Sequence, residues 1–166
     1  MRGRAAIVAV GAAARLAGVY VYAPREVDGL SHPLGAAASR YRVSSRFGPR
    51  ISPITGAPST HQGIDLAVPT GTPVYAVGPG EVYWIGEDPN ASSGLAVGLR
   101  WDGLKFLYFH LSEIRAKLGP VERGTVLGLS GSTGRSTGPH LHFEVRSDVT
   151  GLPLDPEGVF PPGTFA

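Results

Sequence analysis

The 166-residue sequence contains no cysteine, one methionine and only two lysines. The absence of cysteine excludes disulfide bonds and any metal site that uses thiolate ligands. Because lysine is so scarce, thirteen of the fifteen basic residues are arginine. No nucleic-acid-binding motif accompanies these arginines, so we expect no nucleic-acid partner.

Glycine and proline are abundant, with 24 and 15 residues, and most of them separate short apolar runs that resemble strands. These runs are residues 72–77, 80–85, 95–100, 105–111 and 141–145. Their spacing predicts an all-β fold, mainly an antiparallel sheet or sandwich with one open groove. A chain of this length has room for one domain with a substantial core.

Helical signals are few. Residues 111–118 predict one helical turn, with Ser112 as N-cap and Gly119-Pro120 as the stop. A short N-terminal helix is expected in the apolar segment 1–22, which a mixed linker, residues 23–41, follows. The segment 87–94 is predicted to be a solvent loop. The tail, residues 157–166, lacks periodicity and predicts irregular chain along the domain.

Four of the five histidines fall in three short phrases: His61-Gln-Gly-Ile-Asp65, Tyr-Phe-His110 and His140-Leu-His142. Catalytic zinc usually takes three protein ligands from histidine and carboxylate and keeps a fourth position for water. The phrases therefore contain enough ligands for one such site and two further imidazoles. The fifth histidine, His32, has no partner at a suitable spacing, and we assign it no metal role.

Strand alternation predicts how these side chains project. His140, His142 and Glu144 share one face of a strand, while the intervening residues point to the core. The spacing of His61 and Asp65 suits one face of a helix or of an extended segment, and Gly63 favours the extended form.

Two neighbours of the histidines have alternative roles. Glu144 either orients a ligand imidazole or pairs with Arg146. Tyr108 shares a strand face with His110 by alternation, so it either lines the groove or packs as a buried aromatic.

Seven ordered phrases make the chain resemble the lysostaphin-like, or LytM-like, zinc metalloendopeptidases, which cut peptide bonds in bacterial peptidoglycan. The resemblance covers residues 42–156, which it implies are the metalloendopeptidase domain, and the fold of the family is the same all-β fold in outline. Besides the His61 and His110 phrases, it rests on Ser45-Arg-Phe-Gly-Pro-Arg50, Gly71-Thr-Pro-Val-Tyr-Ala76, Gly80-Glu-Val82, Gly124-Thr-Val-Leu-Gly128 and the stretch from Gly131 to Val145, which contains His140-Leu-His142.

The resemblance implies a role for each matched residue. His61, Asp65 and His142 would bind one zinc ion, and His110 and His140 would line the cleft beside it as the catalytic imidazoles. Zinc lowers the pKa of a bound water to about 7, and a histidine can accept its proton. Because the set is complete, we expect an active peptidoglycan endopeptidase; the alternative is a catalytically silent zinc-bound module of an envelope machine or virion.

Charge is uneven along the chain. Residues 1–50 carry eight arginines against two acids, a formal +6, and residues 51–166 carry seven basic residues against eleven acids, a formal −4. The basic half suggests contact with anionic envelope polymers or lipid headgroups.

Residues 1–22 resemble a secretory signal, with a basic start and a following apolar run. A membrane anchor over residues 5–22 is disfavoured by Arg15, which costs about 2.5–3.5 kcal/mol at a bilayer centre. An assembly interface with envelope or virion subunits through residues 1–41 is the third alternative. The expected location is the cell envelope, periplasm or exterior, and the alternative is a virion, such as a phage tail tip that carries its own lysin.

Overall fold

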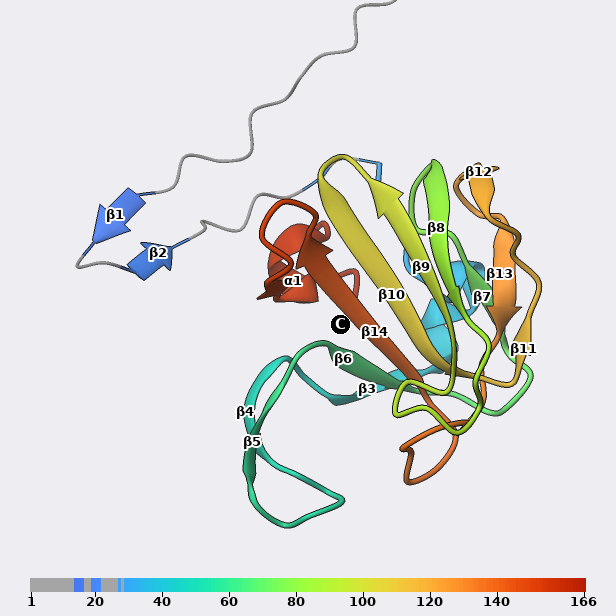
Figure 1. The fold of residues 1–166 in the computed structure, drawn as a ribbon, viewed down its shortest axis with the longest axis horizontal. Helices are drawn as coiled ribbons and strands as arrows, with labels where there is room; N and C mark the ends of the chain where they lie inside the picture. Colours follow the sequence, from blue (N-terminus) through green and yellow to red (C-terminus); the bar gives the residue numbers. More distant parts are fainter. Residues whose placement is uncertain (1–13, 17–18, 22–26, 28) are drawn as a thin grey trace, which may run out of the picture.

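The computed structural model describes residues 14–16, 19–21, 27 and 29–166, and the predicted all-β fold is confirmed in this part of the chain. The main sheet has eight strands (Figure 1). They are β3 (Arg42–Ser45), β6 (Ile64–Ala67), β8 (Gly80–Gly86), β9 (Leu95–Trp101), β10 (Leu104–Leu111), β12 (Gly119–Val121), β14 (Leu141–Ser147) and β15 (Pro153–Leu154).

The neighbours within the main sheet run in the order β12-β8-β9-β10-β14-β6-β3, and β15 also pairs with β14. Every pairing is antiparallel. The long central strands β9, β10 and β14 coincide with predicted runs to within two residues. Their sequences are rich in aromatic and branched apolar residues, which favour a pleated, half-buried surface.

Three smaller units complete the strands. A three-stranded sheet has the order β11-β13-β7, formed by β11 (Glu113–Ile114), β13 (Val126–Leu129) and β7 (Pro73–Tyr75). A hairpin pairs β4 (Gly48–Ile51) with β5 (Pro58–His61) and extends away from the main sheet (Figure 1). A second pair joins β1 (Ala14–Leu16) to β2 (Val19–Val21).

Helices are short in the described chain. They are the 3-10 helix η1 (Gly35–Arg40) and the single turn α1 (Pro156–Val159), which Asp155 caps by accepting a hydrogen bond from the Glu157 N–H at 3.0 Å. In the apolar N-terminal segment, residues 14–16 and 19–21 form strands where a short helix was predicted. The rest of that prediction lies outside the described residues. Among the described residues, no helix is long and apolar enough to cross a bilayer.

The helical turn predicted for residues 111–118 is wrong. The Ser112 N–H donates to the Leu129 carbonyl at 2.9 Å, and the N–H groups of Arg115 and Ala116 both donate to the Leu127 carbonyl. Because strand β13 satisfies these backbone groups, the segment is extended and contains β11. The Ser112 side chain, expected as an N-cap, bonds the Ser130 carbonyl at 2.8 Å.

One hydrophobic core joins the main sheet to the three-stranded sheet, with Val74 and Leu127 of the smaller sheet in the same cluster as Phe106 and Phe143. The cluster also takes in residues on both sides of the predicted domain range, namely Val27, Leu30, Leu34, Val159, Phe160 and Phe165. The tail after residue 156 therefore supplies core side chains, beyond lying along the domain. The opposite face of β14 remains available for polar side chains.

Candidate metal centre and active site

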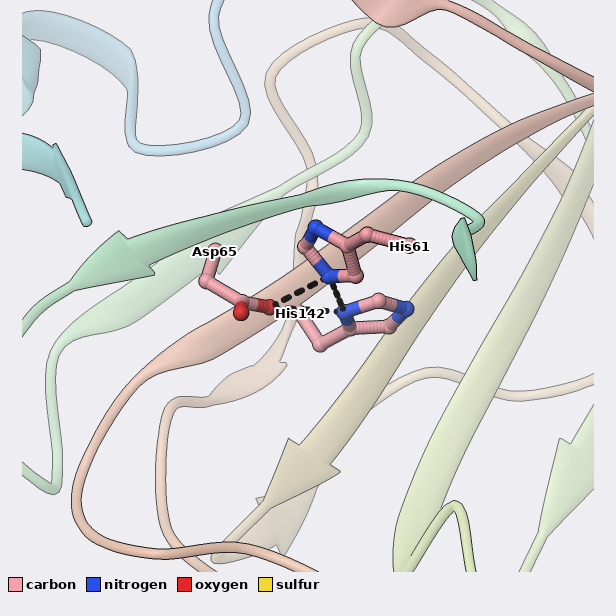
Figure 2. Close-up of side chains that lie close together, drawn as sticks. All are labelled: His61, Asp65 and His142. Carbon is pink, nitrogen blue, oxygen red and sulfur yellow. Dashed lines mark hydrogen bonds and ion pairs between the residues drawn. The ribbon is translucent and has the colours of Figure 1, made fainter. Parts of the chain in front are cut away.

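Three strands bring His61, Asp65 and His142 together (Figure 2). His61 ends β5, Asp65 lies in β6, and Asp65 pairs directly with His142 across β6 and β14. Asp65 Oδ1 lies 2.7 Å from His142 Nδ1 and 3.2 Å from His61 Nε2, and the two nitrogens are 3.1 Å apart. The extended geometry predicted for the His61 phrase is confirmed, and the three residues can hold one metal ion.

Gly63 makes this convergence possible. A Cβ atom at this position would lie 2.3 Å from the Phe143 carbonyl oxygen, which is part of the backbone of β14. Only glycine allows the link between β5 and β6 to approach β14 this closely. The glycine thus places His61 over the strand that carries His142.

The two candidate ligand histidines have their outer nitrogens occupied. His61 Nδ1 lies 2.8 Å from the Arg46 carbonyl, which can only accept, so this nitrogen carries the proton. His142 Nε2 lies 3.0 Å from Glu144 Oε1 and donates to that carboxylate. The remaining nitrogens, His61 Nε2 and His142 Nδ1, direct their lone pairs toward Asp65.

This donor set fits a divalent metal. Two imidazole lone pairs and a carboxylate oxygen point at one another at hydrogen-bond distance, and only a proton or a cation between them removes the repulsion. Although burial opposes its charge, the close contacts with His142 and His61 hold the pKa of Asp65 far below its usual range. Two imidazoles and one carboxylate are the ligand types that catalytic zinc takes, and no thiolate is present.

His110 and His140 lie beside these three candidate ligands. The His110 ring is centred 4.8 Å from the His140 ring and 5.9 Å from the His142 ring. His110 Nδ1 donates to the Thr133 carbonyl and His140 Nδ1 to the Gly138 carbonyl, both at 2.8 Å. In its neutral form each imidazole therefore has its lone pair on Nε2, and His140 Nε2 lies 3.7 Å from Asp65 Oδ1.

His110 reaches the site through a break in strand alternation. Its backbone has φ 62°, an uncommon value for a residue other than glycine, and the pairing of β10 with β9 shifts register between Tyr108 and Leu111. Its N–H donates to the Ser93 carbonyl at 2.9 Å, which helps to hold this conformation. The bulge turns His110 from the core face of β10 to the site.

The proposed shared face of Tyr108 and His110 is therefore wrong, and the alternative, a packed aromatic, is confirmed. Tyr108 is completely buried, and its hydroxyl accepts a hydrogen bond from the Val77 N–H at 3.2 Å. Burial raises the pKa of this phenol well above its usual range. Tyr108 has no contact with the groove.

Both alternatives for Glu144 hold at once. The buried carboxylate accepts from His142 through Oε1 and from the Arg146 Nε–H through Oε2 at 2.6 Å. Burial opposes its charge, but these two donors lower the pKa of Glu144. Burial opposes the charge of His142, but its contacts with Asp65 and Glu144 raise its pKa. Arg146 thus keeps Glu144 ionised, and Glu144 orients the imidazole.

Arg50 is a site residue to which the sequence analysis gave no role. Its Nη1 lies 3.1 Å from Asp65 Oδ2 and also donates to Ser45 Oγ. Its place in the phrase that begins at Ser45 was the available signal. The hairpin of β4 with β5 brings it to Asp65.

The three candidate ligands and both further histidines open into a groove of about 660 Å³. Its other lining includes the β4–β5 hairpin and the predicted solvent loop 87–94, through Ser92 and Ser93. His32 does not line this groove. Its ring packs against Phe165, with centroids 5.0 Å apart, and its Nδ1 accepts the Leu34 N–H at 3.0 Å.

The family model described as Peptidase family M23 matches residues 59–156, which contain all five clustered residues. The chain belongs to this family. A curated relative, the DD-carboxypeptidase/endopeptidase Mpg of Neisseria meningitidis serogroup B, is 45% identical over 119 residues, covering 71% of this chain and 27% of the relative. The chain thus spans about a quarter of the length of that relative.

Solved structures agree with the family. A zinc-containing peptidase from Vibrio cholerae is 39% identical with a TM-score of 0.66, over 76% of this chain and 39% of that one. The catalytic domain of the antimicrobial peptidase lysostaphin from Staphylococcus simulans is 35% identical with a TM-score of 0.64, over 72% of this chain and 91% of that one. The likeness to lysostaphin extends over nearly the whole of its catalytic domain.

Proposed function

We propose that this chain is a zinc-dependent endopeptidase that hydrolyses peptide bonds in bacterial peptidoglycan. The observation that carries the proposal is the protonation pattern of the four clustered histidines. Each of them has one nitrogen hydrogen-bonded to a carbonyl or a carboxylate. His61 and His142 therefore direct a lone pair at Asp65. Beside them, His110 and His140 present an Nε2 atom that has no such partner among the described residues. The names of the relatives, a DD-carboxypeptidase/endopeptidase and a zinc-containing peptidase, support the same activity.

His61, Asp65 and His142 are the residues that would hold the zinc ion. Bound there, zinc supplies a Lewis acid that polarises a carbonyl and makes water nucleophilic at neutral pH. Arg50 and Glu144 keep the carboxylate and one imidazole in place from outside.

His110 and His140 would handle protons and charge. Burial lowers the pKa of His110 to about 4, even though its bond to the Thr133 carbonyl opposes the shift. At neutral pH its Nε2 is therefore free to accept a proton from the attacking water and to return it to the leaving amine. His140 is the second imidazole on the groove side. With its Nδ1 proton held by the Gly138 carbonyl, it would stabilise the oxygen on which negative charge develops when its Nε2 is protonated as well.

A catalytically silent zinc-bound module is the alternative function. A silent module has no need of two imidazoles whose Nε2 atoms remain open toward a groove. Nor does it need the left-handed backbone of His110, which costs about 1–3 kcal/mol and is usual at functional sites. The presence of both His110 and His140 beside the three candidate ligands therefore favours the enzyme.

The test combines metal content with the release of new amines from purified sacculi. The wild type should hold about one zinc per chain. His142→Ala should lose both zinc and cleavage. His110→Ala should keep most of the zinc and lose cleavage by about 10²- to 10⁴-fold, the usual contribution of a general acid–base. Zinc retention by a wild type that cuts no sacculus would show the silent module instead.

The substrate also sets where we propose the enzyme acts, which is the cell envelope, the periplasm or the exterior. Carriage in a virion, as a phage tail lysin, is the alternative location. The contacts predicted for residues 1–41 with membrane, envelope or virion subunits stay predictions, since most of residues 1–28 lie outside the described chain. Labelling of intact virions or of cell fractions with an antibody would separate the two locations.

A further inference from the structure

Three arginine side chains line the groove, and two of them are already paired. Arg50 contacts Asp65, and Arg146 contacts Glu144 at 2.6 Å. Arg135 has no such partner: within the described residues, no carboxylate oxygen lies within 4.0 Å of its guanidinium. Its side chain is exposed to solvent. Each of the two acids that line the groove, Asp65 and Glu144, is thus paired with one arginine. Arg135 is the lining arginine that remains without an acidic partner in the described part of the chain.

The backbone of Arg135 is fixed by a second loop. Its N–H donates to the Ser92 carbonyl at 3.1 Å, and the Gly134 N–H donates to the Pro89 carbonyl at 2.8 Å. Gly134 has φ 72°, and a Cβ there would lie 2.3 Å from the backbone nitrogen of Gly94. The two loops therefore form one closely packed wall, which limits where the arginine can reach.

This wall continues directly into the reaction centre. Ser136 follows Arg135, and its hydroxyl lies 3.3 Å from His140 Nδ1 and 2.8 Å from the Gly138 carbonyl. Five residues after Arg135 the chain reaches His140 itself. A group bound by Arg135 would consequently belong to the same substrate molecule whose peptide bond lies beside His110 and His140.

We propose that Arg135 binds a carboxylate of the substrate close to the scissile bond, so that the enzyme selects anionic stem peptides over amidated or uncharged bridges. A guanidinium presents a planar fork of donors that matches a carboxylate, and ionised partners make the stronger hydrogen bonds. Because Arg50 is paired with Asp65 and Arg146 with Glu144, Arg135 is the arginine available to bind a substrate carboxylate. The inference rests on the proposed endopeptidase function and names the substrate class for the same site.

The experiment compares two defined substrates with zinc-loaded full-length protein. One is a cross-linked stem-peptide dimer with free α-carboxylates, and the other is the same dimer with those carboxylates converted to amides. The wild type should cleave the acidic dimer with a kcat/KM about five- to tenfold higher, as expected for one charge-assisted contact. Arg135→Gln should lose this preference, and Arg135→Lys should keep part of it.

The control is Arg42→Gln, which removes an exposed arginine of β3 that does not line the groove and should retain the full preference. Equal cleavage of both dimers by the wild type would overturn the inference and leave the endopeptidase function standing. A preference that survives Arg135→Gln would also overturn it. Cleavage of neither dimer, nor of sacculi, would instead refute the proposed function. A normal circular dichroism spectrum and zinc content confirm that each variant folds.

Discussion

Arg50 and the two candidate ligand histidines contact opposite oxygens of one carboxylate, with Arg50 Nη1 3.1 Å from Asp65 Oδ2 while His61 and His142 contact Oδ1. Arg50 thereby fixes which oxygen of Asp65 faces His61 and His142. We expect Arg50→Gln to weaken zinc affinity by about 10-fold or more, the usual effect of removing a group that orients a ligand. Competition with a chromophoric chelator measures this affinity.

The matched control is Arg115→Gln, because Arg115 also pairs with an acid, Glu113, at 2.8 Å, but about half of its side chain is exposed. This variant should bind zinc as the wild type does. Equal zinc affinity in both variants would show that Asp65 needs no help from Arg50.

Glu144 should matter to the metal through His142. Glu144→Ala removes the acceptor that keeps the proton on His142 Nε2, and we expect zinc affinity to fall by about 10- to 100-fold. Glu144→Gln keeps an acceptor oxygen, so its zinc affinity should fall less. Isothermal titration with zinc distinguishes the two variants, and an identical loss in both would mean that charge, not orientation, is what Glu144 contributes.

Tyr108 should contribute to stability and not to catalysis. Tyr108→Phe leaves the buried N–H of Val77 without its acceptor, which costs about 1–3 kcal/mol in free energy of unfolding. Urea denaturation measures that loss. Because the side chain lies in the core, kcat/KM at a temperature where the variant is folded should match the wild type; a large fall would return Tyr108 to the groove.

His32 should make stability depend on pH. Burial lowers its pKa to about 4 from an ordinary 6.5, so between these values the unfolded chain binds more protons than the folded one. The resulting stabilisation is present above pH 6.5 and is lost as the pH falls toward 4. The ring is partly exposed, and we expect a loss of about 1–2 kcal/mol between pH 7.5 and 4.5.

His32→Asn is the variant that isolates this effect. Its side-chain oxygen can still accept the Leu34 N–H, but it does not titrate in this range. Both proteins share every other acid-sensitive group, including the metal site, so the difference between their urea midpoints at the two pH values reports His32 alone. Parallel loss of stability in the two proteins would refute the assignment.

Local patterns were sufficient where the backbone follows a regular period. The alternation around His142 correctly placed Phe143 in the core and Glu144 on the groove side, since successive side chains of a strand point to opposite faces. Gly63 likewise favoured the extended form of the His61 phrase, which the structure has.

Local patterns failed where distant backbone groups decide the conformation. Residues 111–118 have helical signals, but the carbonyls of Leu127 and Leu129 bind their N–H groups and hold them extended. At His110, the carbonyls of Ser93 and Thr133 hold a left-handed residue, which breaks the strand alternation and leaves Tyr108 on the opposite face. Neither set of partners is visible in a short window of sequence.

The sequence by itself determined the kinds of groups available: no thiolate, four clustered imidazoles and one aspartate at strand-compatible spacing. Tertiary structure decided which nitrogen of each imidazole is hydrogen-bonded and which nitrogen faces Asp65 or the groove. The carbonyls of Arg46, Thr133 and Gly138, with the Glu144 carboxylate, fix one proton on each imidazole. Because a hydrogen bond to an acceptor selects the tautomer, only the folded chain separates the nitrogens that face Asp65 from those that remain open for proton transfer.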